Sequence, residues 1–139
     1  MEKEILTTKY ITVTFDDETK IYASKYLAAT RNMADEEWQN QMLELKSLIE
    51  TIKPAFIIDD NRERFYGYSP DMQIWTLTLF VDSWNNIGLK KYAQISPREI
   101  VGKLTTQQIE EFAVNDFKMC YQYKLVDDFE SALGWINEK

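Results

Sequence analysis

The chain has 139 residues, 45% of them hydrophobic and 28% charged, which is typical of one globular domain spanning residues 1–139. It has no histidine and one cysteine, which excludes Ser-His-Asp catalysis, imidazole metal sites and an internal disulfide, and favours a reducing, cytoplasmic location. With 16 basic against 23 acidic residues, the net charge of -7 argues against nucleic-acid binding, and we expect neither a signal peptide nor a membrane span.

The start of the chain predicts a β-hairpin. Residues 5–15 and 21–28 are rich in β-branched and aromatic side chains, which favour strands. The polar residues 16–19 between them predict the turn.

A helix and a buried strand are expected next. Acidic residues 35–37 open the helix and Pro54 ends it. Its apolar residues recur at steps of four and three, which predicts one buried stripe of Trp38, Met42, Leu45, Ile49 and Ile52. Residues 55–58 are wholly apolar, as in a central parallel strand, and we expect Asp59-Asp60 to end that strand.

The second half of the chain continues this alternation. Ser69 and Pro70 predict the start of a helix that runs to about Ile87, and Gly88 follows as a stop. Strands are expected at 91–95 and 119–126, with capping boxes at 96–99 and 105–108 opening a helical turn and a helix between them. Asp127 or Asp128 caps the last helix, whose residues Phe129, Leu133 and Ile136 are expected to face the sheet.

This order predicts the α/β class. A hairpin followed by alternating helices and strands gives one mostly parallel mixed sheet of about five strands with four main helices and right-handed crossovers.

Two segments resemble the SpoIIAA-like (STAS/SEC14 domain-like) bacterial family. They are residues 69–75, after an apolar strand and an acidic turn, and residues 126–136, with an acidic cap before Glu130, Ala132 and Trp135. Residues 33–38 are similar to the first helix start of that family. The resemblance covers roughly the whole chain and implies a SpoIIAA-like fold, with either the regulatory binding role of STAS domains or the lipid-holding role of SEC14 domains.

The resemblance also directs attention to a phosphorylation switch. STAS regulators carry a Ser or Thr in an Asp-Ser-x-Gly-like turn after a central strand, whereas the corresponding residues 59–62 here contain neither Ser nor Gly. Ser69 lies near the next helix start in surroundings that do not match the motif.

The loop after the central strand is the first candidate binding site. Open α/β sheets place ligands at the carboxyl ends of parallel strands. A polar ligand could be held there by Asp59, Asp60, Arg62 and Arg64, with Tyr66 and Tyr68 as walls and Ser69 at its end. The alternative is a solvated loop whose charges pair with one another.

The helix from Ser69 supplies the second candidate. Its core-facing stripe is expected to hold Ile74, Leu77, Val81 and Trp84, with Phe80 and Ile87 alongside. A second strip of Met72, Trp75 and Leu79 is expected to be poorly covered within the domain and to contact a partner or an apolar ligand. The alternative is packing on a neighbouring helix.

Nothing in the sequence predicts catalysis, a metal or a cofactor. The acidic pairs at 16–17, 59–60 and 127–128 each have a local role as turn or cap, and Cys120 has the setting of a small buried hydrophobe. We therefore expect a non-enzymatic binding or regulatory module that acts through protein–protein contact with a partner or a second copy. The alternative is a carrier of a small apolar ligand or lipid, of the SEC14 sort.

Overall fold

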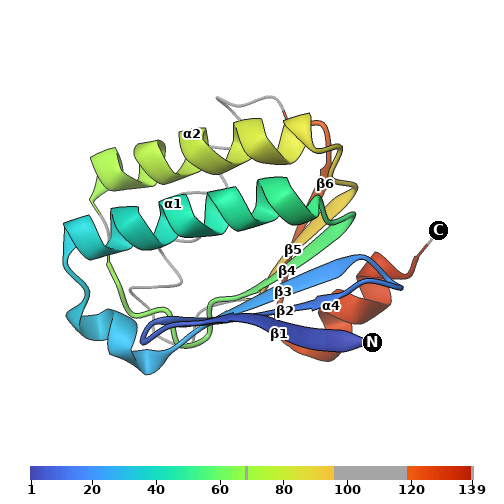
Figure 1. The fold of residues 1–139 in the computed structure, drawn as a ribbon, viewed down its shortest axis with the longest axis horizontal. Helices are drawn as coiled ribbons and strands as arrows, with labels where there is room; N and C mark the ends of the chain where they lie inside the picture. The colour runs from blue at the N-terminus through green and yellow to red at the C-terminus, as the bar shows by residue number, and fades with distance from the viewer. Residues whose placement is uncertain (68, 96–118, 139) are drawn as a thin grey trace.

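A six-stranded mixed sheet runs through the computed structural model, which describes residues 1–67, 69–95 and 119–138 (Figure 1). The strands lie in the order β1-β2-β3-β4-β5-β6. The first two pairings are antiparallel and the other three are parallel. The strand bounds are β1 Glu2–Thr7, β2 Ile11–Asp16, β3 Ile21–Tyr26, β4 Phe56–Asp60, β5 Lys91–Ile95 and β6 Gln122–Val126.

The expected first strand at 5–15 is in fact two strands, which raises the strand count from about five to six. Thr8 makes the turn between β1 and β2: its amide donates to the Ile11 carbonyl at 2.9 Å. Its hydroxyl accepts from the amides of Tyr10 at 3.1 Å and Ile11 at 3.2 Å. Threonine favours strands as well as such turns, so the composition of residues 5–15 did not reveal the turn between β1 and β2.

Three α-helices and one 3₁₀ helix lie in the described ranges. Their bounds are η1 Ala28–Asn32, α1 Asp35–Ile52, α2 Pro70–Asn86 and α4 Phe129–Ile136. The Ser69 hydroxyl caps α2 and the Asp128 carboxylate caps α4, as the sequence predicts. The helical turn and helix expected within 96–113 lie outside the described residues.

The helices cover the sheet unequally (Figure 1). Helices α1 and α2 lie side by side on one face, over a large core. That core includes Trp38, Met42, Leu45 and Ile49 of the predicted α1 stripe, whereas Ile52, its last predicted member, is only half-buried. Helix α4 covers the other face over a smaller core of Ile58, Ala93, Ile95, Val126, Ala132 and Ile136. None of the helices in the described ranges is long and apolar enough to cross a membrane.

Strand β4 is central, as predicted, but it extends two residues further than expected. Asp59 and Asp60 do not end it, because they pair in register with Gln94 and Ile95 of β5. Alternation along the strand sends their side chains to opposite faces of the sheet.

Two side chains of the predicted helix stripes are more exposed than expected. Ile74 in α2 is 42% exposed, although Val81, seven residues later on the same side of the helix, is 2% exposed; Ile74 lies near the start of α2. Phe129 is 38% exposed because it is the first residue of α4, whereas Ala132 and Ile136 on the same side of that helix are buried.

Candidate functional site

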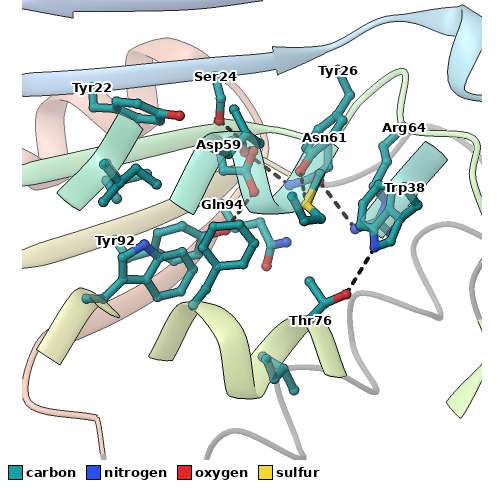
Figure 2. Close-up of a pocket in the computed structure, with 17 residues that line it drawn as sticks. Tyr22, Ser24, Tyr26, Trp38, Asp59, Asn61, Arg64, Thr76, Tyr92 and Gln94 are labelled. Carbon is teal, nitrogen blue, oxygen red and sulfur yellow. Dashed lines mark hydrogen bonds between the residues drawn. The ribbon is translucent and has the colours of Figure 1, made fainter. Parts of the chain in front are cut away.

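A cavity of about 70 Å³ lies between the sheet and the α1/α2 layer (Figure 2). Strands β3, β4 and β5 form its floor, the two helices form its roof, and the loop after β4 closes one end. The floor and loop residues are Tyr22, Ser24, Tyr26, Ile57, Asp59, Asn61, Arg64, Tyr92 and Gln94.

Strand register aligns the floor in two rows across the sheet. Tyr22, Ile57 and Tyr92 are partners in one row. Ser24, Asp59 and Gln94 are partners in the next polar row, two residues further along each strand. Side chains two residues apart share a face of a strand, so both rows point toward the helices.

Asp59 is the centre of a hydrogen-bonded group on this floor. The Ser24 hydroxyl donates to its Oδ1 at 2.8 Å and the Tyr92 hydroxyl donates to its Oδ2 at 2.7 Å. Burial raises the pKa of the Asp59 carboxyl, although the two hydroxyls and the Arg64 cation oppose that rise. Burial and the neighbouring Asp59 also raise the pKa of Tyr92. A buried carboxyl with a raised pKa in a cavity is typical of functional sites.

The loop after β4 brings a buried cation to the same cavity. The Asn61 amide nitrogen donates to the Asp59 carbonyl oxygen at 3.1 Å, and its side-chain oxygen accepts from Arg64 Nη1 at 3.3 Å. Arg64 is only 2% exposed. Asn61 therefore fixes the guanidinium at the end of the cavity where β4 ends.

Some buried groups on the cavity wall have no hydrogen-bond partner in the described part of the chain, among them the Tyr22 hydroxyl and the Trp84 indole N–H. Burial also raises the pKa of Tyr22, so its hydroxyl keeps its proton at neutral pH. A buried polar group without a partner costs about 1–3 kcal/mol, so such groups usually meet water or a ligand.

Stacked aromatic rings make the walls of the cavity rigid. The Trp84 ring lies 4.4 Å from Tyr92 and 5.4 Å from Phe80, centroid to centroid. At the other end, Trp38 stacks on Tyr26 at 5.8 Å, and its indole N–H donates to Thr76 Oγ1 at 3.0 Å. The cavity is thus held open by packed side chains from both layers.

The residues predicted in the loop divide between the two faces of the sheet. Asp59 and Arg64 line the cavity. Arg62 instead pairs with Asp60, its Nε and Nη2 donating to the two carboxylate oxygens at 3.0 and 2.7 Å. Ser69 is the cap of α2, its hydroxyl accepting from the Met72 amide at 3.2 Å.

Of the two tyrosines predicted as walls, Tyr66 does not line the cavity. Tyr66 stacks on Trp38 at 4.6 Å and donates its hydroxyl to Asp35. Tyr68 lies outside the described residues.

The strip of Met72, Trp75 and Leu79 is more covered than expected. Met72 is 9% exposed and belongs to the large core, so the expectation of poor coverage is wrong for this residue. Trp75 and Leu79 are half-buried and pack against that core. A role of the strip in partner or ligand contact stays a prediction.

The sequence interpretation missed Tyr22, Ser24, Trp84, Tyr92 and Gln94. One signal pointed to them: polar side chains sit at alternate positions of strands that are otherwise suited to burial, as with Ser24 and Gln94. The register of three strands brings these residues together, and a local sequence pattern does not predict that register.

Two further points of the sequence analysis concern Cys120 and metal ligands. Cys120 is exposed just before β6, contrary to the expected buried setting, and its amide donates to Asn85 Oδ1 at 2.8 Å. Within the described ranges, no three acidic or cysteine side chains group as metal ligands would.

No family model, curated protein or solved structure matches this chain. The resemblance to the SpoIIAA-like family therefore stays a prediction.

Proposed function

We propose that this chain is a binding module that holds a small, partly apolar molecule in the cavity between the sheet and the α1/α2 layer. The observation that carries the proposal is the pair of buried groups without protein partners, the Tyr22 hydroxyl and the Trp84 indole N–H. A bound molecule that reaches both would remove the cost of leaving them unpaired. The proposal shares its class with the ligand-carrier alternative of the sequence analysis but differs in place, because Met72, Trp75 and Leu79 do not line this cavity.

The composition of the cavity supports this proposal. Ligand sites are mostly apolar and aromatic, with a few placed polar groups that fix orientation. Here six aromatic side chains supply the walls, and Asp59, Gln94 and Arg64 supply polar groups. The polar groups lie toward the carboxyl ends of parallel strands, where α/β sheets place ligands.

The size of the cavity sets the scale of the ligand. Since one water needs about 10–15 Å³ of cavity volume, a cavity of about 70 Å³ holds a few waters or a molecule of a few heavy atoms. A molecule of that size must displace ordered water, so the test has to separate a ligand from structural water.

The tryptophans provide a direct reporter. The chain has four, and each indole N–H gives its own signal in a heteronuclear NMR spectrum. Trp84 lines the cavity, whereas Trp135 packs on the opposite face of the sheet and serves as the internal control. The probes are propionamide, propionate, propylammonium, n-butanol and phenol, titrated to tens of millimolar.

We expect at least one probe to shift the Trp84 signal in a saturable way without moving the Trp135 signal. Leu77→Phe, which adds bulk to the cavity wall, should abolish the shift, whereas the matched change Leu133→Phe on α4 should not. If no probe moves the Trp84 signal, the cavity holds only structural water and the proposal is wrong.

The protein-contact function stays a prediction. The large apolar residues exposed in the described ranges are Met1, Leu43, Ile74 and Phe129, and they are spread over the N-terminus and three different helices. No single element therefore presents a continuous apolar surface for us to argue from.

A further inference from the structure

We propose that the molecule held in the cavity is neutral and presents a carbonyl oxygen, as in a small amide or ketone. This inference rests on the proposed binding function and names the class of ligand for the same site. It follows from two features of the cavity: buried hydrogen-bond donors without a partner among the described residues, and charged side chains of opposite sign.

The cavity wall carries buried hydrogen-bond donors that no group of the described residues engages. The Tyr22 hydroxyl and the Trp84 N–H are both buried there without partners. The side-chain oxygen of Gln94 accepts from the Tyr123 hydroxyl at 2.6 Å, so the end of Gln94 that is left for the cavity is its NH₂ group. Figure 2 shows Gln94 on the floor beside Asp59, directed toward the helices.

Three oxygen atoms at the cavity each already accept one hydrogen bond. Both carboxylate oxygens of Asp59 accept hydroxyl hydrogen bonds, from Ser24 and Tyr92. Thr76 Oγ1 accepts from the Trp38 indole and donates to the Met72 carbonyl. A ligand that brings an acceptor oxygen therefore matches the unpaired Tyr22 hydroxyl and Trp84 N–H.

The charge of the cavity is balanced without a ligand. Asp59 and Arg64 are the charged side chains among the described residues that line it, and their charges are opposite. A cation would meet the buried Arg64, and an anion would meet the buried Asp59. Either would also lose its hydration, which a neutral molecule avoids.

Three molecules of nearly equal size test the class. Propionamide is neutral with a carbonyl oxygen, propionate is an anion, and propylammonium is a cation with donors only. We expect propionamide to shift the Trp84 indole signal with at least about tenfold higher affinity than either ion at neutral pH, since each ion would lose its hydration in a cavity whose charges are already balanced.

A variant tests the role of the unpaired hydroxyl. Tyr22→Phe removes only that group and should weaken propionamide binding about fivefold to tenfold. The matched control is Tyr10→Phe, because the Tyr10 hydroxyl donates to Glu37 outside the cavity and its loss should leave the affinity unchanged.

Each outcome decides between the two proposals. If an ion binds as tightly as propionamide, or only n-butanol or phenol binds, the cavity is a binding site but the neutral-carbonyl class is wrong. An unchanged affinity in Tyr22→Phe would equally overturn the assigned contact. If none of the five probes moves the Trp84 signal, the binding function itself fails.

Discussion

The two faces of the sheet are built from alternate residues of the same strands, yet they bury different chemistry. Under α4, Ile58, Ala93 and Ile95 are fully buried in a small apolar core, and the Asp60–Arg62 pair lies at the end of β4. Under α1 and α2, the same strands present Tyr22, Ser24 and other polar side chains to a cavity. The first face has the composition of a packed core, and the second has that of a binding site.

Strand β4 carries the contrast in two adjacent residues. Burial raises the pKa of Asp59 on the cavity face. Burial also acts to raise the pKa of Asp60, but the hydrogen bonds from Arg62 outweigh it and the pKa is lowered. The environment on each face, and not the residue type, therefore decides the direction in which the pKa of a carboxyl shifts.

The largest expected effect compares two neighbouring isoleucines. Ile58→Ala should cost toward the upper end of the about 2–5 kcal/mol seen for buried truncations, because its dry core would keep an empty hole. Ile57→Ala should cost toward the lower end, because its space joins the existing cavity. Urea denaturation measures both, and a larger cost for Ile57→Ala would contradict the distinction between the faces.

A smaller effect compares two tyrosines of one row. Tyr92→Phe should cost about 1–3 kcal/mol, because it leaves a buried oxygen of Asp59 without its donor. Tyr22→Phe should change the free energy of unfolding by about 0.5 kcal/mol or less, because its hydroxyl has no partner to lose in the described part of the chain. Thermal and urea unfolding without added ligand measure both, and equal costs would show that Tyr22 has a bound partner.

The pH dependence of stability should differ in sign for the two aspartates. Asp59 has a raised pKa when folded, so its contribution to stability is present at low pH and is lost as pH rises above about 4. Asp60 has a lowered pKa, so its contribution is present above about pH 4 and is lost as pH falls below that value. Asp59→Asn should therefore flatten the loss of stability on the alkaline side of pH 4, and Asp60→Asn the loss on the acid side.

Urea denaturation across the range from acid to neutral pH measures these slopes. The exposed Asp17→Asn serves as a control that should alter neither side. If Asp59→Asn and Asp60→Asn changed the same side of the curve, the opposite environments of the two carboxyls would be wrong.

The smallest expected effect lies on α4. Phe129→Ala should cost about 0.5 kcal/mol or less, since the ring is 38% exposed. Ile136→Ala on the same helix serves as the positive control, because that side chain is 4% exposed. A cost for Phe129→Ala near that of Ile136→Ala would show that the Phe129 ring also packs against the small core, as the sequence predicts.

The features that the sequence predicted well are local ones. Ser69 with Pro70, and Asp128, mark helix starts through hydrogen bonds to amides only a few residues away, so their patterns are visible in the chain. The stripe from Trp38 to Ile49 follows the helical period in the same way. These signals were enough to predict the α/β class and the central position of β4.

The candidate site was predicted only in part, because it depends on contacts across strands. Asp59 and Arg64 were found from their loop, but nothing local links Ser24 or Gln94 to them. Strand β4 also extends beyond its apolar residues, because its pairing with β3 and β5 continues through Asp59 and Asp60. Arg62 and Arg64 are two residues apart and serve opposite faces, which depends on the path of the backbone after β4.

The polar row of Ser24, Asp59 and Gln94 also has a consequence for how the chain folds. The contact between Ser24 and Asp59 spans 35 residues, and that between Asp59 and Tyr92 spans 33, so each closes a long loop through a parallel crossover. A slip of one residue in β4 would turn Asp59 toward α4 and place Ile58 in the cavity. The cavity can therefore exist only after three strands have met in the correct register, and a folding intermediate with a single crossover has no binding site.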